Sequence, residues 1–93
     1  MFDAELKQMR ELIQTRRYVM TLHAEEEMDA DGLTIFDIES AILTGRITER
    51  QRDRHPDAWK YLISGQALDG AAVMVVAKFG AADKLVLITV FRE

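Results

Sequence analysis

At 93 residues the chain has room for a single domain, residues 1–93, and for no second core. Its composition, 48% hydrophobic and 30% charged with a net charge of -4, predicts a folded domain and argues against a wholly basic nucleic-acid binder. Cysteine is absent and the apolar runs are only strand-length, which excludes disulfides, thiolate metal sites and membrane insertion and favours a cytoplasmic location.

Helical periodicity dominates the first part of the chain. Leu6, Met9 and Ile13 repeat at three- and four-residue steps and predict a helix that ends near Arg16. The residues from Tyr18 to Met20 favour a short strand or an extended link. A second helix is expected to begin at Thr21, to carry His23 and to end at Gly32.

A third helix is predicted by a capping pattern. Thr34 is followed by Asp37, which matches the hydroxyl-x-x-acid signature of a helix N-terminus. Ile38 and Ile42 then contribute to an apolar stripe, and Gly45 ends it.

After Gly45 the apolar period changes to two, which predicts strands separated by short turns. Asp69-Gly70 and the segment from Gly80 to Asp83 are turn signals that make neighbouring strands antiparallel. The expected strands are Ile47 to Arg52, Trp59 to Gly65, Val73 to Phe79 and Leu85 to Phe91. The fold class is therefore α+β, with two or three N-terminal helices packed on a C-terminal antiparallel β-meander of three to four strands.

The predicted strands differ in polarity. The first is nearly all charged or polar, which suits an edge strand or a strand that presents its arginines to a ligand. The last two are apolar at almost every position, which indicates central strands covered on both faces, or by helices on one face and a partner on the other. A homodimer through such a face would be unsurprising.

His23 is the first candidate for chemistry. It precedes Glu26 and Glu27 by three and four residues, so an imidazole-carboxylate pair is available on one helix face. The pair could hold a catalytic tautomer, or the imidazole could simply pack at the junction with the sheet. The sequence implies no metal site, because no third ligand stands at a suitable spacing and His55 is the only other histidine.

Cations in the second part of the chain are the other candidates. Residues up to 42 hold four basic and ten acidic side chains, whereas residues from 43 hold eight basic and six acidic ones. Cleaving RNA without a metal requires a proton acceptor, a proton donor and cations facing the phosphorus. The alternation of the strands would let several cations converge on one sheet face, the alternative being scattered surface charges. These cations are Arg46, Arg50, Arg52, Arg54, Lys60, Lys78 and Arg92.

Aromatic residues on the same strands have two interpretations. Trp59 and Tyr61 share a strand face and are interpreted as core aromatics rather than as platforms for base stacking.

A set of short motifs resembles a bacterial family catalogued as a domain of unknown function. The motifs are His23-Ala24 with Glu26 to Met28, then Asp31-Gly32-Leu33-Thr34, Asp37-Ile38, Ala41-Ile42, Gly45, and Ile88-Thr89-Val90-Phe91. The resemblance covers about residues 16 to 92.

This resemblance implies a function. Members of the family are often encoded beside YgiT-type zinc-finger antitoxins, and the layout is similar to the motility quorum-sensing regulator toxins, which are messenger-RNA interferases of RelE-like fold. By order along the chain, the functional cations of those toxins would fall near Arg50, Lys60 and Arg92. Glu27 departs from the family pattern, since many members have arginine there.

The first hypothesis is a toxin-type, metal-independent endoribonuclease of a toxin-antitoxin pair, with RNA as substrate and no cofactor. His23 or Glu26 would transfer protons, and Arg46, Arg50, Lys60 and Arg92 would position phosphate, with Arg52, Arg54 and Lys78 as further RNA-binding residues. The alternatives are a non-catalytic interaction module that binds a partner protein and a small-molecule binder that uses the cleft between helices and sheet. Convergence of Arg50, Lys60 and Arg92 on one concave site with His23 would favour cleavage.

Overall fold

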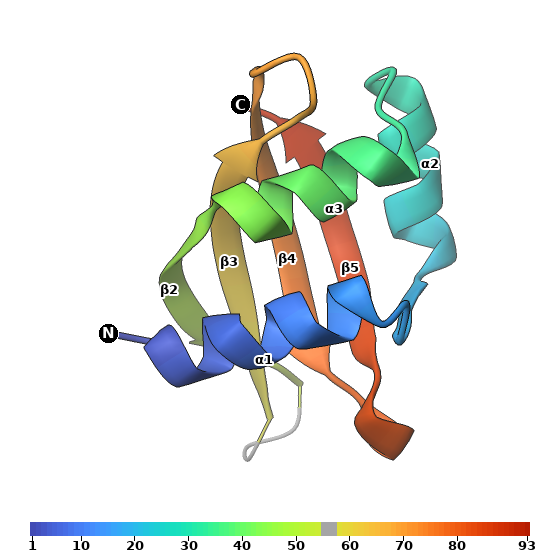
Figure 1. Cartoon of the computed structure of the whole chain (residues 1–93). Helices are drawn as coiled ribbons and strands as arrows, with labels where there is room; N and C mark the ends of the chain where they lie inside the picture. The colour runs from blue at the N-terminus through green and yellow to red at the C-terminus, as the bar shows by residue number, and fades with distance from the viewer. Residues whose placement is uncertain (55–57) are drawn as a thin grey trace.

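The fold follows the predicted sequence of helices and strands. The computed structural model describes residues 1–54 and 58–93, so His55 lies outside the described residues. Within them the helices are α1 (Asp3–Gln14), α2 (Leu22–Ala30) and α3 (Ile35–Thr44), and the strands are β1 (Tyr18–Met20), β2 (Arg46–Arg52), β3 (Trp59–Gln66), β4 (Ala72–Phe79) and β5 (Leu85–Arg92), with a 3-10 turn η1 (Ala81–Asp83) between the last two. The expected α+β class is confirmed (Figure 1).

The described strands form one sheet in the order β1-β5-β4-β3-β2. Strands β2 to β5 pair antiparallel with their chain neighbours, which is the predicted meander. Strand β1 adds a fifth, parallel strand at the other edge, where Tyr18 pairs with Leu85 and Met20 with Leu87. The segment expected as a strand or a link is therefore a strand, and it makes the sheet mixed.

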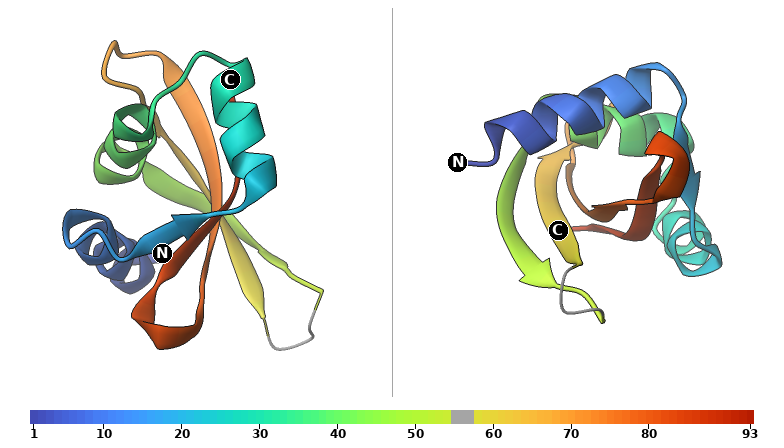
Figure 2. Two further views of the ribbon diagram at one scale, coloured as in Figure 1. Left: turned by 90° about the vertical axis from the view of Figure 1, so that its right-hand side faces the viewer. Right: turned by 90° about the horizontal axis from the view of Figure 1, so that it is seen from below.

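Helices α1 and α3 cover one face of the sheet, and no helix of the described residues covers the other face (Figure 2). Alternation assigns the side chains to these faces, because Ile63, Val75 and Ala77 are buried whereas Leu62 and Val76 between them are partly exposed. The core lies between the helices and the covered face. We call the uncovered side of the sheet the open face.

Helix α3 begins and ends at the predicted residues. The Thr34 hydroxyl accepts from the Asp37 N–H and the Asp37 carboxylate accepts from the Thr34 N–H, which completes the capping box. The C-terminal carbonyls are bound from outside the helix, where the Arg10 guanidinium of α1 donates to Ile42 O at 3.3 Å and to Gly45 O at 2.8 Å. Arg10 thus ties α1 to the point where α3 turns into β2.

Helix α2 stands beside β5 and covers the edge that the short strand β1 leaves open (Figure 1). The Thr21 hydroxyl donates to Ile88 O at 3.1 Å, while Glu27 and Asp31 accept from the Val90 and Arg92 N–H groups at 3.3 and 2.9 Å. At the opposite edge β2 is exposed and polar, as predicted for an edge strand. Among the described residues, no helix is long and apolar enough to cross a membrane.

Candidate nucleic-acid interface

A β-bulge in β2 decides where its arginines lie. Arg46 pairs with Ser64, but the register shifts between Ile47 and Glu49, so that Arg50 pairs with Tyr61. Ser64 and Tyr61 are three residues apart on β3 and face opposite sides of the sheet. Arg46 therefore lies on the open face, whereas Arg50 lies on the covered face, so the regular alternation that would let the arginines of this strand share one face is interrupted.

The Trp59 ring contacts both arginines that follow the bulge, Arg50 and Arg52. The Arg50 guanidinium carbon lies 4.1 Å from the Trp59 ring centroid and that of Arg52 lies 4.3 Å from it. The Phe2 ring is also within 5.8 Å of Arg50. Such cation–π contacts hold the two guanidinium groups against the ring.

Two lysines occupy the open face at the same end of the sheet. Lys78 Nζ lies 3.0 Å from Asp53 Oδ2, and the hydrogen bond from Lys78, then that from the Arg54 backbone, hold the pKa of Asp53 below its usual range. The charge of Lys60 acts in the same direction. Asp53 is therefore an ionised carboxylate set among cations. We call the set of Arg50, Arg52, Arg54, Lys60 and Lys78 the basic end.

Two hollows open at the basic end. One, of about 330 Å³, is lined by Ala58, Trp59, Tyr61, Lys78 and Phe79. The other, of about 360 Å³, lies on the open face and is lined by Thr21, Asp53, Arg54, Lys78, Val86 and Ile88. Lys78 is common to both hollows, so a bound chain could pass from the aromatic rings of the first to the carboxylate of the second.

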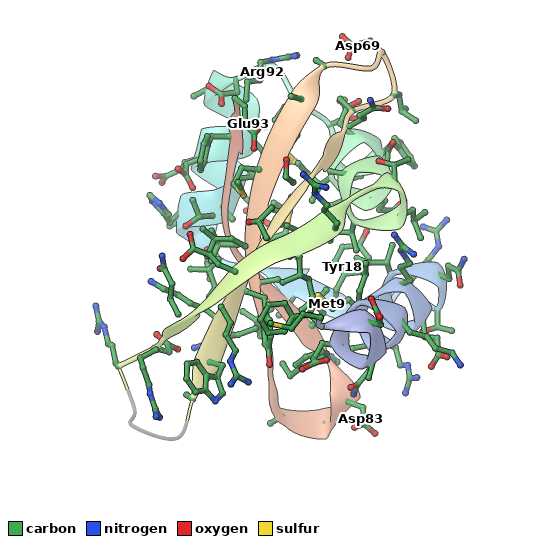
Figure 3. All side chains as sticks on the ribbon, turned by 90° about the vertical axis from the view of Figure 1, so that its left-hand side faces the viewer. Met9, Tyr18, Asp69, Asp83, Arg92 and Glu93 are labelled. Atoms are coloured by element: carbon green, nitrogen blue, oxygen red, sulfur yellow. The ribbon has the colours of Figure 1, made fainter. Side chains whose placement is uncertain are left out.

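Arg92 lies at the other end of the sheet. It pairs with Val73, whereas Arg50 lies in the row of Tyr61 and Ala77, with two strands between them. Four residues along the strands and three strand spacings separate the two arginines by roughly 20 Å across the sheet. Figure 3 labels Arg92 near Asp69, far from Asp83 at the opposite end. The Arg92 guanidinium donates to Asp31 O at 2.8 Å, which is a structural contact with α2.

His23 and Glu26 are both exposed on α2, beside the edge of the sheet opposite β2. The His23 imidazole pairs with Glu27, with Nε2 3.0 Å from Oε1, rather than with Glu26. Glu27 in turn accepts the Val90 N–H, so the pair helps α2 to cover β5. Neither His23 nor Glu26 lines the hollows of the basic end.

The structure thus divides the predicted site residues. It gathers Arg50, Arg52, Arg54, Lys60 and Lys78 at one end and leaves His23, Glu26, Arg46 and Arg92 elsewhere. Convergence of Arg50, Lys60, Arg92 and His23 on one concave site, the arrangement that would favour cleavage, does not occur, because Arg92 and His23 lie away from the basic end. Among the residues that the structure describes, no three His, Cys, Asp or Glu side chains are grouped to hold a metal ion.

Two residues of this site were not proposed from the sequence. Asp53 interrupts a run of arginines and gave no signal of its own, since its role depends on the hairpin that brings it to Lys78. Trp59 packs against the core, as its interpretation as a core aromatic predicts, but it is also partly exposed and its ring contacts the guanidinium groups of Arg50 and Arg52. Tyr61 is buried at 6% exposure, as expected of a core residue.

The comparisons with known proteins identify a family but no characterised relative. A family model described as "Domain of unknown function (DUF4258)" matches residues 20–92. Neither the curated proteins nor the solved structures contain a match to the chain.

Proposed function

This chain belongs to the DUF4258 family, and we propose that its basic end binds single-stranded RNA and cleaves it without a metal, as a toxin-type endoribonuclease. One observation carries the proposal: five cations, a partly exposed tryptophan and an ionised carboxylate lie at one end of the sheet, where Lys78 lines two adjoining hollows and Arg54 lines one of them. Cations that face phosphate and rings that stack on bases are the parts from which single-strand binding sites are built.

We assign the proton transfers to Asp53, which is ionised, and to Lys78, whose ammonium contacts it at 3.0 Å. The RNA 2'-hydroxyl attacks the neighbouring phosphorus and passes its proton to the Asp53 carboxylate, while the bond from phosphorus to the 5'-oxygen breaks and that oxygen takes a proton from the Lys78 ammonium. The products are a 2',3'-cyclic phosphate and a 5'-hydroxyl. The 3.0 Å contact between the two side chains then allows the proton on Asp53 to return to Lys78.

This assignment replaces the roles first expected for His23 and Glu26. Arg54 lines the hollow of Asp53 and would face the charge that develops on the phosphorane oxygens. Arg50 and Arg52 would hold the neighbouring phosphates.

RNA binding is tested with a fluorescently labelled single-stranded RNA at several salt concentrations. The double variant Arg50→Ala with Arg52→Ala should bind more weakly, and the slope of log K against log salt should fall in magnitude by about 1.4 for two lost phosphate contacts. The double variant Arg16→Ala with Arg17→Ala is the charge-matched control, because these exposed arginines precede β1 at the opposite edge of the sheet. Equal binding by the double variant and the wild type would contradict the proposal.

Cleavage is tested with the same RNA in the presence of a chelator. We expect fragments that end in a 2',3'-cyclic phosphate. Induced expression in a bacterial host should also arrest growth with loss of total RNA, and a zinc-finger antitoxin is the partner we propose to relieve that arrest. Harmless accumulation of folded wild-type protein would contradict the toxin part of the proposal.

The open face favours a second candidate function, that of a protein-interaction module. Alternation places several apolar side chains on this face, all at least partly exposed: Leu62, Met74, Val76, Val86, Ile88 and Phe91. A contiguous apolar patch of this kind commonly marks an interface with another protein. A folded chain that elutes as a dimer and leaves RNA intact would support this candidate over the nuclease.

A further inference from the structure

The hollow beside Trp59 has rigid aromatic walls. Tyr61 and Phe79 meet edge to face with ring centroids 5.8 Å apart, and Phe2 also meets Tyr61 edge to face, at 6.0 Å. Tyr61 is buried at 6% exposure, so its ring is fixed by the core. A ligand that enters this hollow therefore meets walls that are already ordered and loses little side-chain freedom on binding.

One rim of the hollow carries a positive charge. Lys78 lines it together with the aromatic rings, and the Lys78 side chain is 38% exposed. Lys78 can bind a phosphate while it keeps its contact with Asp53. The ammonium has three donors, and the carboxylate occupies one of them at 3.0 Å.

Size and chemistry together identify the class of ligand. A volume of about 330 Å³ is near the lower end of the range for small-molecule sites, roughly 300 to 1,000 Å³, and suits one nucleotide rather than a base-paired duplex. An inorganic anion would make no use of the three rings, and a purely apolar ligand would make no use of Lys78. A planar base attached to a phosphate uses both.

We infer that this hollow is a nucleotide subsite, in which one unpaired base lies against Phe79 and beside Trp59, whose ring the guanidinium groups of Arg50 and Arg52 contact, while its phosphate meets Lys78. The inference rests on the proposed RNA-binding function and specifies what the basic end takes from the RNA. It also specifies the path of the bound RNA, because the next phosphate along the RNA strand would reach the hollow that Asp53 and Arg54 line.

Trp59 allows a direct test, because it is the only tryptophan in the chain. Its fluorescence is followed while adenosine 5'-monophosphate, adenosine, ribose 5-phosphate or inorganic phosphate is added to the full chain. The monophosphate should quench the emission saturably, with an affinity at least about tenfold higher than that of adenosine or ribose 5-phosphate. Equal effects of inorganic phosphate and the monophosphate would overturn the base site.

Variants locate the effect. Phe79→Leu should weaken monophosphate binding about tenfold, whereas Phe91→Leu, the same change at an exposed position at the other end of the sheet, should not. If Phe79→Leu fails to fold, Lys78→Gln takes its place, with the exposed Lys84→Gln as its control. Equal binding by the site variant and its control would overturn the subsite.

The same proteins separate this inference from the proposed function. RNA binding that depends on Arg50 and Arg52, without saturable quenching by the monophosphate, would overturn the subsite and leave the RNA-binding function standing. Loss of both would overturn the function itself. RNA binding that weakens in Phe79→Leu but not in Phe91→Leu would support both.

Discussion

Contact with Trp59 restricts the side-chain conformations of Arg50 and Arg52 before any ligand binds. An unsupported arginine on an exposed strand samples many rotamers, and ordering it on a phosphate costs conformational entropy. Here both guanidinium groups already lie against Trp59, at 4.1 and 4.3 Å from its ring. Part of that entropic cost is therefore met when the protein folds.

Asp53 has opposite effects on binding and on cleavage, and a single change should separate them. Asp53→Asn removes a negative charge from beside Lys78 and Lys60, so RNA affinity should rise severalfold at low salt. The same change removes the proton acceptor, so cleavage should fall by about 100-fold or more. Affinity is measured by fluorescence anisotropy and cleavage by gel electrophoresis of labelled RNA.

Asp29→Asn is the matched control for this prediction, because it makes the same charge change on the exposed surface of α2. An increase in affinity of equal size in both variants would attribute the effect to net charge. If the Asp53→Asn variant still cleaves RNA at the wild-type rate, Asp53 is not the proton acceptor of the proposed mechanism.

Tyr18 gives a prediction about alkaline stability. Its hydroxyl donates to Glu39 Oε2 at 2.5 Å, and burial, followed by this hydrogen bond to a carboxylate, raises the pKa of Tyr18 to about 12. An unfolded tyrosine ionises near pH 10. The stabilisation is thus complete below pH 10 and is lost as the pH rises from 10 to 12.

Tyr18→Phe should be less stable than the wild type at pH 8, and the difference should shrink between pH 10 and 12. Urea unfolding at several pH values measures it. Glu39→Gln is the control that keeps a hydrogen-bond acceptor but removes the charge. A wild type and a Tyr18→Phe variant that lose stability in parallel over this range would contradict the assignment.

At the scale of whole elements, α3 and β3 approach so closely that only glycine fits between them. A Cβ on Gly65 would lie 1.9 Å from Ala41 O and 2.8 Å from Ala41 Cα. Both are backbone atoms of α3, so relief requires the helix to move away from the sheet. Gly65→Ala should therefore destabilise the protein by about 1–3 kcal/mol or more.

Equilibrium urea unfolding measures this loss, with Ser64→Ala on the neighbouring, partly exposed position as the control. Gly45, which precedes β2, packs closely against the same carbonyl oxygen, since a Cβ there would lie 2.4 Å from it. A movement of α3 in Gly65→Ala should therefore also shift the start of β2. Unchanged stability would mean that α3 does not rest on β3 as closely as the distances indicate.

The elements themselves could be predicted from the sequence because their signals are local. The pair Thr34 and Asp37 predicts where α3 begins, and the alternation of apolar residues predicts which side of β3 and β4 is buried. The partner of β1 could not be predicted in this way. Three residues from Tyr18 to Met20 carry no register information, and their pairing with β5 depends on how α1 packs.

The candidate site was harder to predict because it depends on one irregularity. The bulge near Thr48 reverses the faces of the residues that follow, so regular alternation assigns Arg46 and Arg50 to the same side when they lie on opposite sides. Arg92 was linked to Arg50 by order along the chain, which does not show that β5 presents it at the other end of the sheet.

At the scale of the whole molecule, the family match and the folded unit differ in extent. The match begins at residue 20, whereas α1 spans Asp3–Gln14 and buries Met9, Leu12 and Ile13 in the core. The segment before the match thus supplies part of the core that positions the sheet. It also contributes Phe2, whose ring contacts both Tyr61 and Arg50.

Removal of residues 1–14 should therefore unfold this chain although it leaves the family region intact. The deletion takes away three buried apolar side chains and the Arg10 contacts that close the end of α3. Met9→Ala alone, at a fully buried position, should cost about 2–5 kcal/mol. Circular dichroism and thermal unfolding compare both proteins with Lys7→Ala, an exposed position on the same helix. A cooperative transition in the truncated chain would show that residues 15–93 form a domain without α1, and the basic end would then have to keep its geometry without Phe2.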